Sequence, residues 1–235
     1  MFGIEELFER GMHYGHRKWR SSPKMSDYIF CEKWGIFVID LSKTVPLFHA
    51  ALEALKSCAA RGGKILFVGT KHQAKELVLE AAQGCSQYYV NKRWLGGTLT
   101  NSYTIGMSIR KLAKIEKDEI AGEFMKLTKK ERVSLLTKKE KMISLLGGIK
   151  KMGGVPDMLV VVDPKKEQTA INEAKSMNIP VIALADTDTP DPSVISYIVP
   201  GNDEGRNSVG FFLSKCMEAI NEGIEKSQQK EKEVN

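Results

Sequence analysis

Histidines and aspartates are the residues whose types and spacing could support chemistry in this chain. His13 and His16 stand three positions apart in GMHYGH, a spacing that would present both imidazoles to one metal ion on a helix. Gly11 and Gly15 disfavour a stable helix there, and no third ligand lies nearby in the sequence. We therefore expect these imidazoles to contact an anionic partner or to pack within the fold.

Aspartates cluster after two segments that have the composition of β-strands. Asp186, Asp188 and Asp191 lie in ADTDTPDP, and Asp203 follows the next apolar segment. The carboxyl ends of strands are the usual ligand-binding edge of an open α/β sheet, and carboxylates suit Mg²⁺. We predict Asp186, Asp188 and Asp203 as candidate metal ligands, with solvated loop acids as the alternative. No cofactor is required, and Mg²⁺ is the one these oxygens could hold.

A nucleotide-binding enzyme is the second hypothesis, because the turn VGTKHQAK follows a strand-like segment. Backbone amides at the start of a helix there could bind a phosphate. The turn lacks the GxxxxGK[ST] and GxGxxG patterns, and the chain contains no GxSxG or HExxH. We therefore expect no catalytic residue and no small-molecule substrate, although fold alone does not exclude an enzyme acting on a dinucleotide or a sugar phosphate.

Basic residues beside tryptophans form two segments, HRKWR and NKRW. Lysine and arginine neutralise phosphates, and an indole can stack on an unpaired base, so both segments are typical of contact with RNA. Trp19 and Trp94 could equally be anchors packed into the body. The candidate RNA-binding residues in these segments and in the SSPKM that follows HRKWR are His16, Arg17, Lys18, Arg20, Lys24, Lys92 and Arg93.

The net charge of +6 is concentrated in one part of the chain. Residues 110–151 contain thirteen Lys and Arg against six Asp and Glu, a difference of +7, so the remaining residues sum to −1. A local excess of positive charge is typical of a nucleic-acid contact surface. Arg110, Lys111 and Lys114 are the candidate RNA-binding residues of this segment.

The apolar pattern predicts strands that alternate with helices. Short apolar runs, suited to buried strands, occur at 36–41, 65–68, 88–90, 158–162, 181–184 and 194–199. Apolar residues at helical spacing occur at about 4–11, 44–61, 74–81, 166–177 and from 206 onward. The fold class is therefore α/β, with a parallel sheet covered by helices on both faces.

The strand pattern stops between residues 105 and 149. Two amphipathic stretches with narrow apolar stripes replace it, and Thr128 with Glu131 has the spacing of a capping box at the start of the second. We predict an inserted antiparallel, coiled-coil-like helical hairpin that projects from the body. The expected parts are an N-terminal helix and basic loop (1–35), the α/β body (36–104 and 150–226), the hairpin (105–149) and a disordered tail (227–235).

Composition places the chain among globular proteins. Of its 235 residues 42% are hydrophobic and 27% charged, and no apolar stretch has the length of a membrane span. The N-terminal segment lacks the pattern of a signal peptide, and the four cysteines are scattered without a CxxC pair. We expect an intracellular protein with reduced cysteines and no membrane partner.

Seven ordered motifs resemble one known family. They are GMHYGH, PKM, KILFVGTK, YVNKRWLGGTLTN, GGIKKMGGVPDMLVVVD, IPVIALADT and VPGND, and they extend over almost the whole chain. Together they are similar to the bacterial-type ribosomal small-subunit protein two family. The chain differs from the family in its longer acidic loop (DTDTPDP) and its short tail.

The resemblance implies a flavodoxin-like parallel sheet with an inserted helical hairpin. It also implies a structural, non-enzymatic component of the small ribosomal subunit, in the cytoplasm of a bacterium or in an organelle of bacterial descent. The expected partners are small-subunit ribosomal RNA near the junction of head and body, and neighbouring proteins of the subunit. These include the messenger-binding small-subunit protein one, whose docking the family supports. A protein-docking adaptor is a third hypothesis, and it is compatible with this one.

Overall fold

The computed structural model describes residues 2–234, without the side chains of residues 126 and 230–235. Its centre is a five-stranded parallel sheet in the order β5-β4-β6-β7-β8. Because β4 and β5 are the first two of these strands along the chain, this is the flavodoxin-like order that the resemblance implied. The strands are β4 (Ile65–Val68), β5 (Tyr88–Val90), β6 (Met158–Val162), β7 (Val181–Ala185) and β8 (Tyr197–Pro200).

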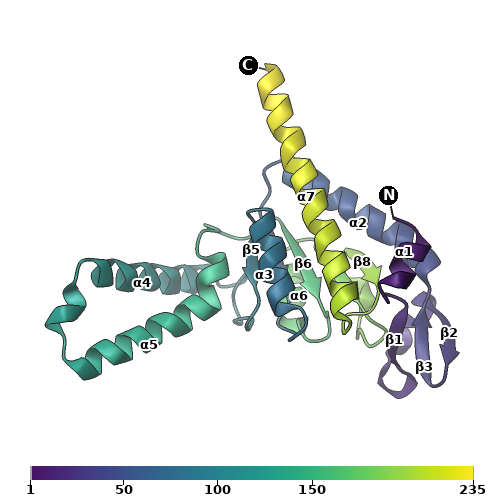
Figure 1. Ribbon diagram of the computed structural model, residues 1–235, viewed down its shortest axis with the longest axis horizontal. Coiled ribbons are helices and arrows are strands. Elements are labelled where there is room, and N and C mark those ends of the chain that lie inside the picture. Colours follow the sequence, from purple (N-terminus) through teal and green to yellow (C-terminus); the bar gives the residue numbers. More distant parts are fainter. Residues whose placement is uncertain (1, 235) are drawn as a thin grey trace.

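Helices cover both faces of this sheet, as the buried strands require (Figure 1). Every residue of β4, β6 and β7 is buried, so both faces of these strands must meet apolar partners. One face packs on α1 (Ile4–Glu9), α2 (Leu41–Ala60), α3 (Lys75–Gly84) and α7 (Arg206–Val234). The other packs on α6 (Gln168–Ser176), on residues 94–99 and on the base of the hairpin.

The predicted hairpin is present and extends away from the body (Figure 1). It consists of α4 (Ser102–Ile120), the 3₁₀ turn η3 (Glu123–Lys126), α5 (Lys129–Leu146) and η4 (Gly147–Ile149). Thr128 and Glu131 form the expected capping box at the start of α5. The only buried residues of α4 are Leu112 and Ile115, so the hairpin is held by a narrow apolar seam and exposes most of its surface.

Residues 14–39 form a second, antiparallel sheet, which differs from the sequence-based prediction. Its strands are β1 (Tyr14–Arg17), β2 (Ile29–Lys33) and β3 (Ile36–Ile39), in the order β1-β3-β2. We expected a loop before residue 25 and a strand of the parallel sheet at 36–41. Positive φ angles at Trp34 (52°) and Gly35 (75°) instead make a tight turn that pairs β3 back onto β2.

The 3₁₀ turns η1 (Lys18–Arg20) and η2 (Pro23–Tyr28) connect β1 to β2, and η5 (Pro192–Val194) precedes β8. Helix α7 continues to Val234, whereas the polar composition of residues 227–235 predicted disorder. Lys, Glu and Gln are good helix formers and can extend a helix whose earlier turns are anchored by packing. None of the helices within the described residues is long and apolar enough to cross a membrane.

Candidate functional site

Charged side chains gather at the carboxyl ends of the parallel strands, in a group that we call the strand-end cluster. Lys71 follows β4, Asp163 follows β6, and Asp186 and Asp188 follow β7. The remaining members are Asp203 and Glu204, which follow β8, and His16 from β1. The small antiparallel sheet therefore brings His16 to the edge where the sequence placed the aspartates.

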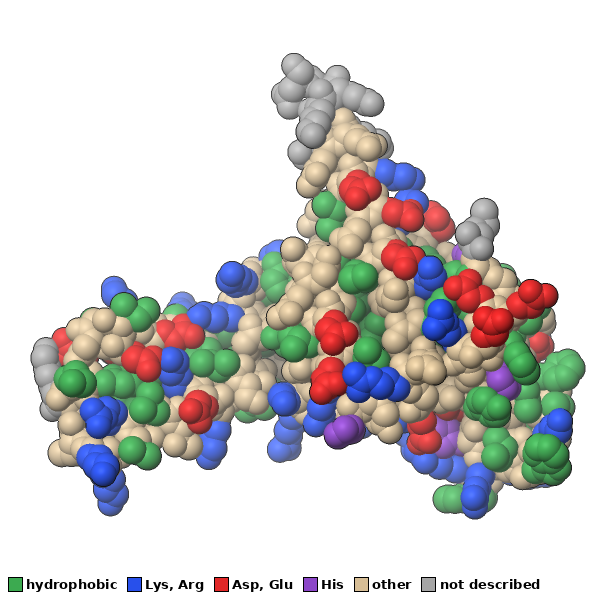
Figure 2. All heavy atoms as spheres, in the orientation of Figure 1, with side chains coloured by type: hydrophobic (Ala, Val, Ile, Leu, Met, Phe, Trp, Pro, Cys, Tyr) green, Lys and Arg blue, Asp and Glu red, His purple; other side chains and the backbone are tan. Residues whose placement is uncertain are grey.

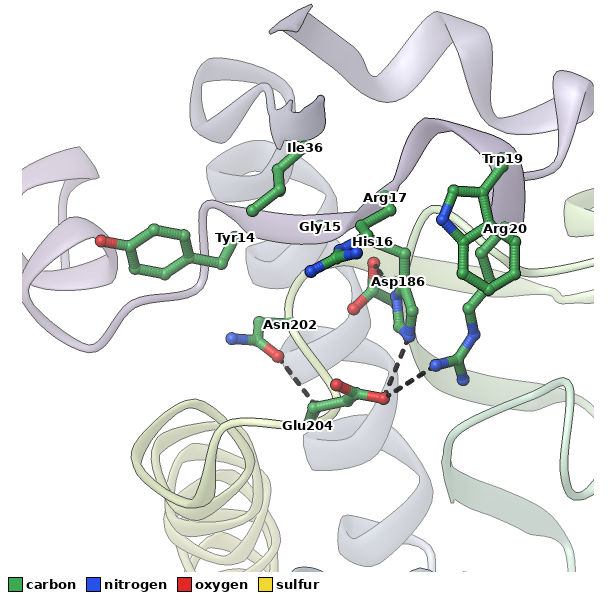
Figure 3. A pocket seen from close by; sticks show the side chains of 10 residues that line it. All are labelled: Tyr14, Gly15, His16, Arg17, Trp19, Arg20, Ile36, Asp186, Asn202 and Glu204. Atoms are coloured by element: carbon green, nitrogen blue, oxygen red, sulfur yellow. Dashed lines mark hydrogen bonds and ion pairs between the residues drawn. The ribbon is translucent and has the colours of Figure 1, made fainter. Parts of the chain in front are cut away.

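His16 is almost fully buried and lies between carboxylates. Its Nδ1 atom is 3.0 Å from Asp186 Oδ1, and its Nε2 atom is 3.1 Å from Glu204 Oε1. The backbone N–H of His16 donates a hydrogen bond of 2.9 Å to Thr187 Oγ1, which anchors the strand. Figure 3 shows the imidazole directed toward Asp186 and Glu204, in a pocket that Trp19 and Arg20 also line.

Lys71 is the second cation of the cluster, and its ammonium is neutralised within the protein. Its Nζ atom lies 2.7 Å from Asp203 Oδ1, 3.4 Å from Asp163 Oδ2 and 3.7 Å from Glu204 Oε1. The side chain of Lys71 is only 12% exposed. The lysine of the VGTK turn therefore already forms ion pairs with carboxylates, which argues against its binding a nucleotide phosphate.

The electrostatics of the cluster shift several pKa values. Burial lowers the pKa of His16, but the hydrogen bond to Asp186 and the charges of Asp186 and Asp188 outweigh it and raise that pKa to about 9. Burial, together with the nearby Asp186 and Asp163, raises the pKa of Asp203 to about 7 despite the opposing effect of Lys71. Both pKa values are therefore raised, so His16 and Asp203 bind their protons more tightly at this edge of the sheet than they would in water.

Three residues of the cluster could hold a metal ion. Ligand atoms of His16, Asp186 and Asp203 all lie within 4.8 Å of one another. One buried atom of this set, Asp203 Oδ2, has no hydrogen-bond partner among the described residues. An imidazole with carboxylates suits Zn²⁺ and similar transition ions as well as, or better than, Mg²⁺.

Asp188, the third predicted metal ligand, lies outside this set of three residues. Its Oδ2 atom is 3.2 Å from Arg20 Nε and 3.1 Å from Lys165 Nζ. Asp188, which we expected to bind a metal, therefore forms ion pairs with two cations. His16, which the sequence suggested as an RNA contact, is instead the third candidate ligand, beside Asp186 and Asp203.

The cations of the HRKWR segment are mostly paired with acids, unlike the free cluster that we expected. Arg20 reaches Asp188 and Glu204, Lys18 lies 2.9 Å from Glu32, and Lys24 lies 3.2 Å from Asp191. Arg17 is exposed and forms no ion pair within the described part of the chain. Trp19 is 80% exposed, so it does not serve as a packed anchor.

Glu173, which was not among the predicted site residues, holds the loop of the second basic segment in place. Its buried carboxylate accepts hydrogen bonds from Trp94 Nε1 (3.0 Å) and from the backbone N–H groups of Gly97 (2.8 Å) and Leu99 (2.9 Å). Trp94 is 8% exposed and is an anchor packed in the body. The same loop carries Lys92 and Arg93, which are exposed and form no ion pair with described residues.

The hairpin separates paired cations from unpaired ones. Glu116 and Glu119 of α4 bond to Lys150 and Lys139, so these charges are offset between the two helices and at the base of the hairpin. The predicted RNA contacts Arg110, Lys111 and Lys114 are exposed and have no acidic partner among the described residues. Figure 2 shows Lys and Arg side chains along the hairpin and at its base.

Lys111 also stands beside Lys138 of α5, a contact between like charges. The adjacent Lys111 ammonium lowers the pKa of Lys138, because protonating both side chains brings two positive charges together. Like charges that face each other across two helices favour an anion between or above them. The sequence could not reveal this pair, since it depends on how α4 and α5 align.

Asp163 and Glu204 were not among the predicted site residues, and Lys71 was considered only as the lysine of the VGTK turn. Asp163 could have been found, because it comes directly after a buried apolar strand, as Asp186 does. Glu204 gives no such signal. The buried thiols offer no reactive alternative, since burial raises the pKa of Cys85 to about 11.

The structure is that of a parallel α/β protein with an inserted helical hairpin and an internally paired strand-end cluster. The family model described as ribosomal protein S2 matches residues 7–223. The chain belongs to this family, whose members are structural components of the small ribosomal subunit, and the resemblance seen in the sequence motifs is confirmed.

Similar proteins from several bacteria are named small ribosomal subunit protein uS2. The one from Bradyrhizobium sp. (strain ORS 278) is 48% identical over 227 residues, which are 97% of this chain and 69% of the relative. The one from Methylorubrum populi is 49% identical over 97% of this chain and 64% of the relative. The one from Rhodopseudomonas palustris (strain BisB18) is 46% identical over 97% of this chain and 68% of the relative.

Proposed function

We propose that the protein binds small-subunit ribosomal RNA near the junction of head and body, as a structural component of the subunit. The contacts run through the phosphate backbone, with the hairpin and the Lys92–Arg93 loop as the main surfaces. The observation that carries the proposal is the set of exposed cations that have no acidic partner among the described side chains: Lys92, Arg93, Arg110, Lys111 and Lys114. Such cations release counterions when they neutralise phosphates, which drives RNA binding.

The proposal gives the HRKWR segment a smaller electrostatic role than the hairpin. Arg20, Lys18 and Lys24 already face carboxylates, so RNA contact there must compete with internal ion pairs. Arg17 keeps its full charge for a phosphate. The RNA-binding surface is therefore centred on the hairpin and its base.

We also propose that the antiparallel sheet supports docking of the messenger-binding small-subunit protein one. Trp19 (80% exposed), Phe30 (72%) and Trp34 (91%) gather aromatic surface around this sheet. Exposed aromatic surface of this kind is typical of protein interfaces.

A divalent cation at His16, Asp186 and Asp203 is a further part of the proposal. It would neutralise two buried carboxylates and would satisfy Asp203 Oδ2, which has no hydrogen-bond partner among the described residues. Its role would be structural, because it would tie β1 to the ends of β7 and β8. Titrating chelator-treated protein with Zn²⁺ and with Mg²⁺ tests this, since binding must raise the melting temperature and the variant Asp203→Asn must not respond.

RNA binding is tested by the salt dependence of affinity for small-subunit ribosomal RNA. The variant Lys111→Gln/Lys114→Gln should bind more weakly and should flatten the plot of log affinity against log salt by about 0.7–0.9 per lost contact. The matched control is Lys139→Gln/Lys150→Gln, which removes two cations already paired with Glu119 and Glu116. Equal weakening by both variants would contradict a specific contact by the unpaired residues.

Incorporation into the subunit is tested by sedimentation of cell extract through a sucrose gradient. The protein should migrate with the small subunit at low salt and should dissociate from it at high salt. Sedimentation at the position of free protein under both conditions would overturn the proposal.

A further inference from the structure

A groove lies at the base of the hairpin, between the first turns of α4 and the segment 149–154, and we call it the hairpin-root groove. Its volume is about 460 Å³, a size typical of sites for small ligands. The groove lies at the start of α4, the helix that leaves the body there to form the hairpin. Arg110 and Lys150 line the groove, but neither the ion pair of Lys150 with Glu116 nor the exposed charge of Arg110 explains why a groove is present.

Tyr103 forms one wall of the groove and is 73% exposed. An exposed tyrosine buries little apolar area within its own chain, so packing does not account for it. The guanidinium carbon of Arg110 lies 5.9 Å from the centre of the Tyr103 ring, which steadies the ring by a cation–π contact. A steadied, solvent-facing ring is a suitable stacking surface for a nucleobase.

Gly106 lies in the groove wall on the interior turns of α4, and the rest of the chain does not require it. A Cβ atom built at this position meets nothing within 4 Å. Glycine destabilises a helix interior relative to alanine. Because a side chain would fit at position 106 without a clash, the packing of this chain does not explain why glycine is present there. The missing side chain keeps the groove accessible, as happens where a ligand approaches the backbone closely.

The polarity of the groove changes from its floor to its rim. Ile149 and Met152 are buried and supply an apolar floor. Along α4 from the rim, Arg110, Lys114 and Lys117 recur at helical spacing, are exposed and form no ion pair with described residues. A base fits the apolar floor, and the phosphates that flank it fit the cationic rim.

We infer that the hairpin-root groove binds one unpaired nucleotide of RNA, with its base stacked on Tyr103 and a flanking phosphate at Arg110. The inference rests on the proposed function, because it names a subsite within an RNA-binding surface. It adds recognition of a flipped-out or single-stranded base to contacts that otherwise reach only the backbone. An apolar side chain of a protein partner is the competing occupant.

The test compares the affinity of the full chain for a short fluorescent single-stranded oligoribonucleotide and for the same sequence in a duplex. Tyr103→Ala should weaken single-strand binding about tenfold and leave duplex binding unchanged, and Tyr103→Trp should restore it. Gly106→Leu should block the groove and give the same loss while helix content stays equal or rises. Ile120→Ala, an exposed apolar residue on the same helix, and Thr137→Leu on α5 are the controls and should have no effect.

Each outcome separates this inference from the proposed function. Salt-sensitive binding by the wild type that neither Tyr103→Ala nor Gly106→Leu alters would overturn the groove alone. Absence of binding to either RNA would overturn both. If the two variants enter the small subunit poorly yet bind single-stranded RNA normally, the occupant is a protein side chain and the nucleotide inference fails.

Discussion

At the scale of single residues, buried carboxylates determine the shape of the candidate surfaces. Glu173 collects donors from the loop 94–100, and Asp186 and Asp203 hold His16 and Lys71 at the sheet edge. Leaving buried donors or charges without partners costs more than the contacts themselves contribute. These acids therefore act on RNA binding through the loops that they position.

Replacing Glu173 tests this role. Glu173→Ala leaves the indole N–H of Trp94 and the backbone N–H groups of Gly97 and Leu99 without their acceptor. We expect the free energy of unfolding to fall by about 3 kcal/mol, measured by urea denaturation. Asn172→Ala, on the same helix, is the control. An unchanged midpoint for Glu173→Ala would show that water replaces the carboxylate.

The pKa of His16 predicts a dependence of stability on pH. Because the folded-state pKa is raised from 6.5 to about 9, the stabilisation is fully present below pH 6.5 and is lost as the pH rises toward 9. Chelator-treated protein should lose about 2 kcal/mol of unfolding free energy over this range. The pKa of Asp203 is also raised, from 3.8 to about 7, so its contribution to the unfolding free energy is likewise lost as the pH rises, but over a lower pH range.

The variant His16→Gln isolates the contribution of the imidazole. Its stability should change much less between pH 6.5 and 9, although it should be lower at pH 6. A wild-type stability that rises over this range would show that His16 is neutral in the folded protein.

At the scale of elements, the hairpin is an attachment whose base belongs to the core. Leu146 and Ile149 are buried in the cluster that covers one face of the parallel sheet, and Ile105 and Ile109 pack against it. Farther out, the buried side chains among the described residues are Leu112, Ile115 and Phe124. The sequence-based boundary at 105–149 therefore includes residues that the body needs.

Two deletions distinguish the base from the projecting part. Replacing residues 113–140 with a short Gly-Ser linker should leave a body that melts cooperatively, with small loss of stability. Replacing residues 105–149 should remove several buried apolar side chains and cost several kcal/mol. Calorimetry measures both. A molten product from the shorter deletion would mean that the outer hairpin is required for folding.

At the scale of the whole molecule, an enzyme-like sheet carries no free phosphate site at its usual ligand edge. Lys71 is tied to Asp203, and His16 to Asp186 and Glu204, so the edge is electrostatically satisfied from within. Unpaired positive charge lies instead on the hairpin and on the Lys92–Arg93 loop. The molecule therefore presents its binding charge away from the position that a flavodoxin-like enzyme would use.

Ligand-induced stabilisation tests this arrangement in the intact protein. Saturating ATP, NAD(P), flavin or sugar phosphate should not shift the melting temperature measurably, because a ligand stabilises only a state that it binds. A shift of several degrees that Lys71→Ala abolishes would indicate a nucleotide site in the VGTK turn.

The sequence by itself determined the elements that can be predicted from neighbouring residues alone. Apolar runs without polar interruption predicted β4, β6 and β7, because a strand buried on both faces needs such a run. The capping box of Thr128 and Glu131 was readable because all its atoms lie within four residues. The motifs identified the family on the same local basis.

Only the tertiary structure decided which charges remain free. Arg20 and Asp188, His16 and Asp186, and Lys71 and Asp203 are each more than 130 positions apart, so no local pattern relates them. The small sheet was missed for the same reason, because the pairing of β1 with β3 depends on a turn at Trp34 and Gly35 and not on hydrophobic periodicity. A cation neutralised by a distant acid and a cation free to bind RNA look alike in sequence, since the difference lies in the path of the chain between them.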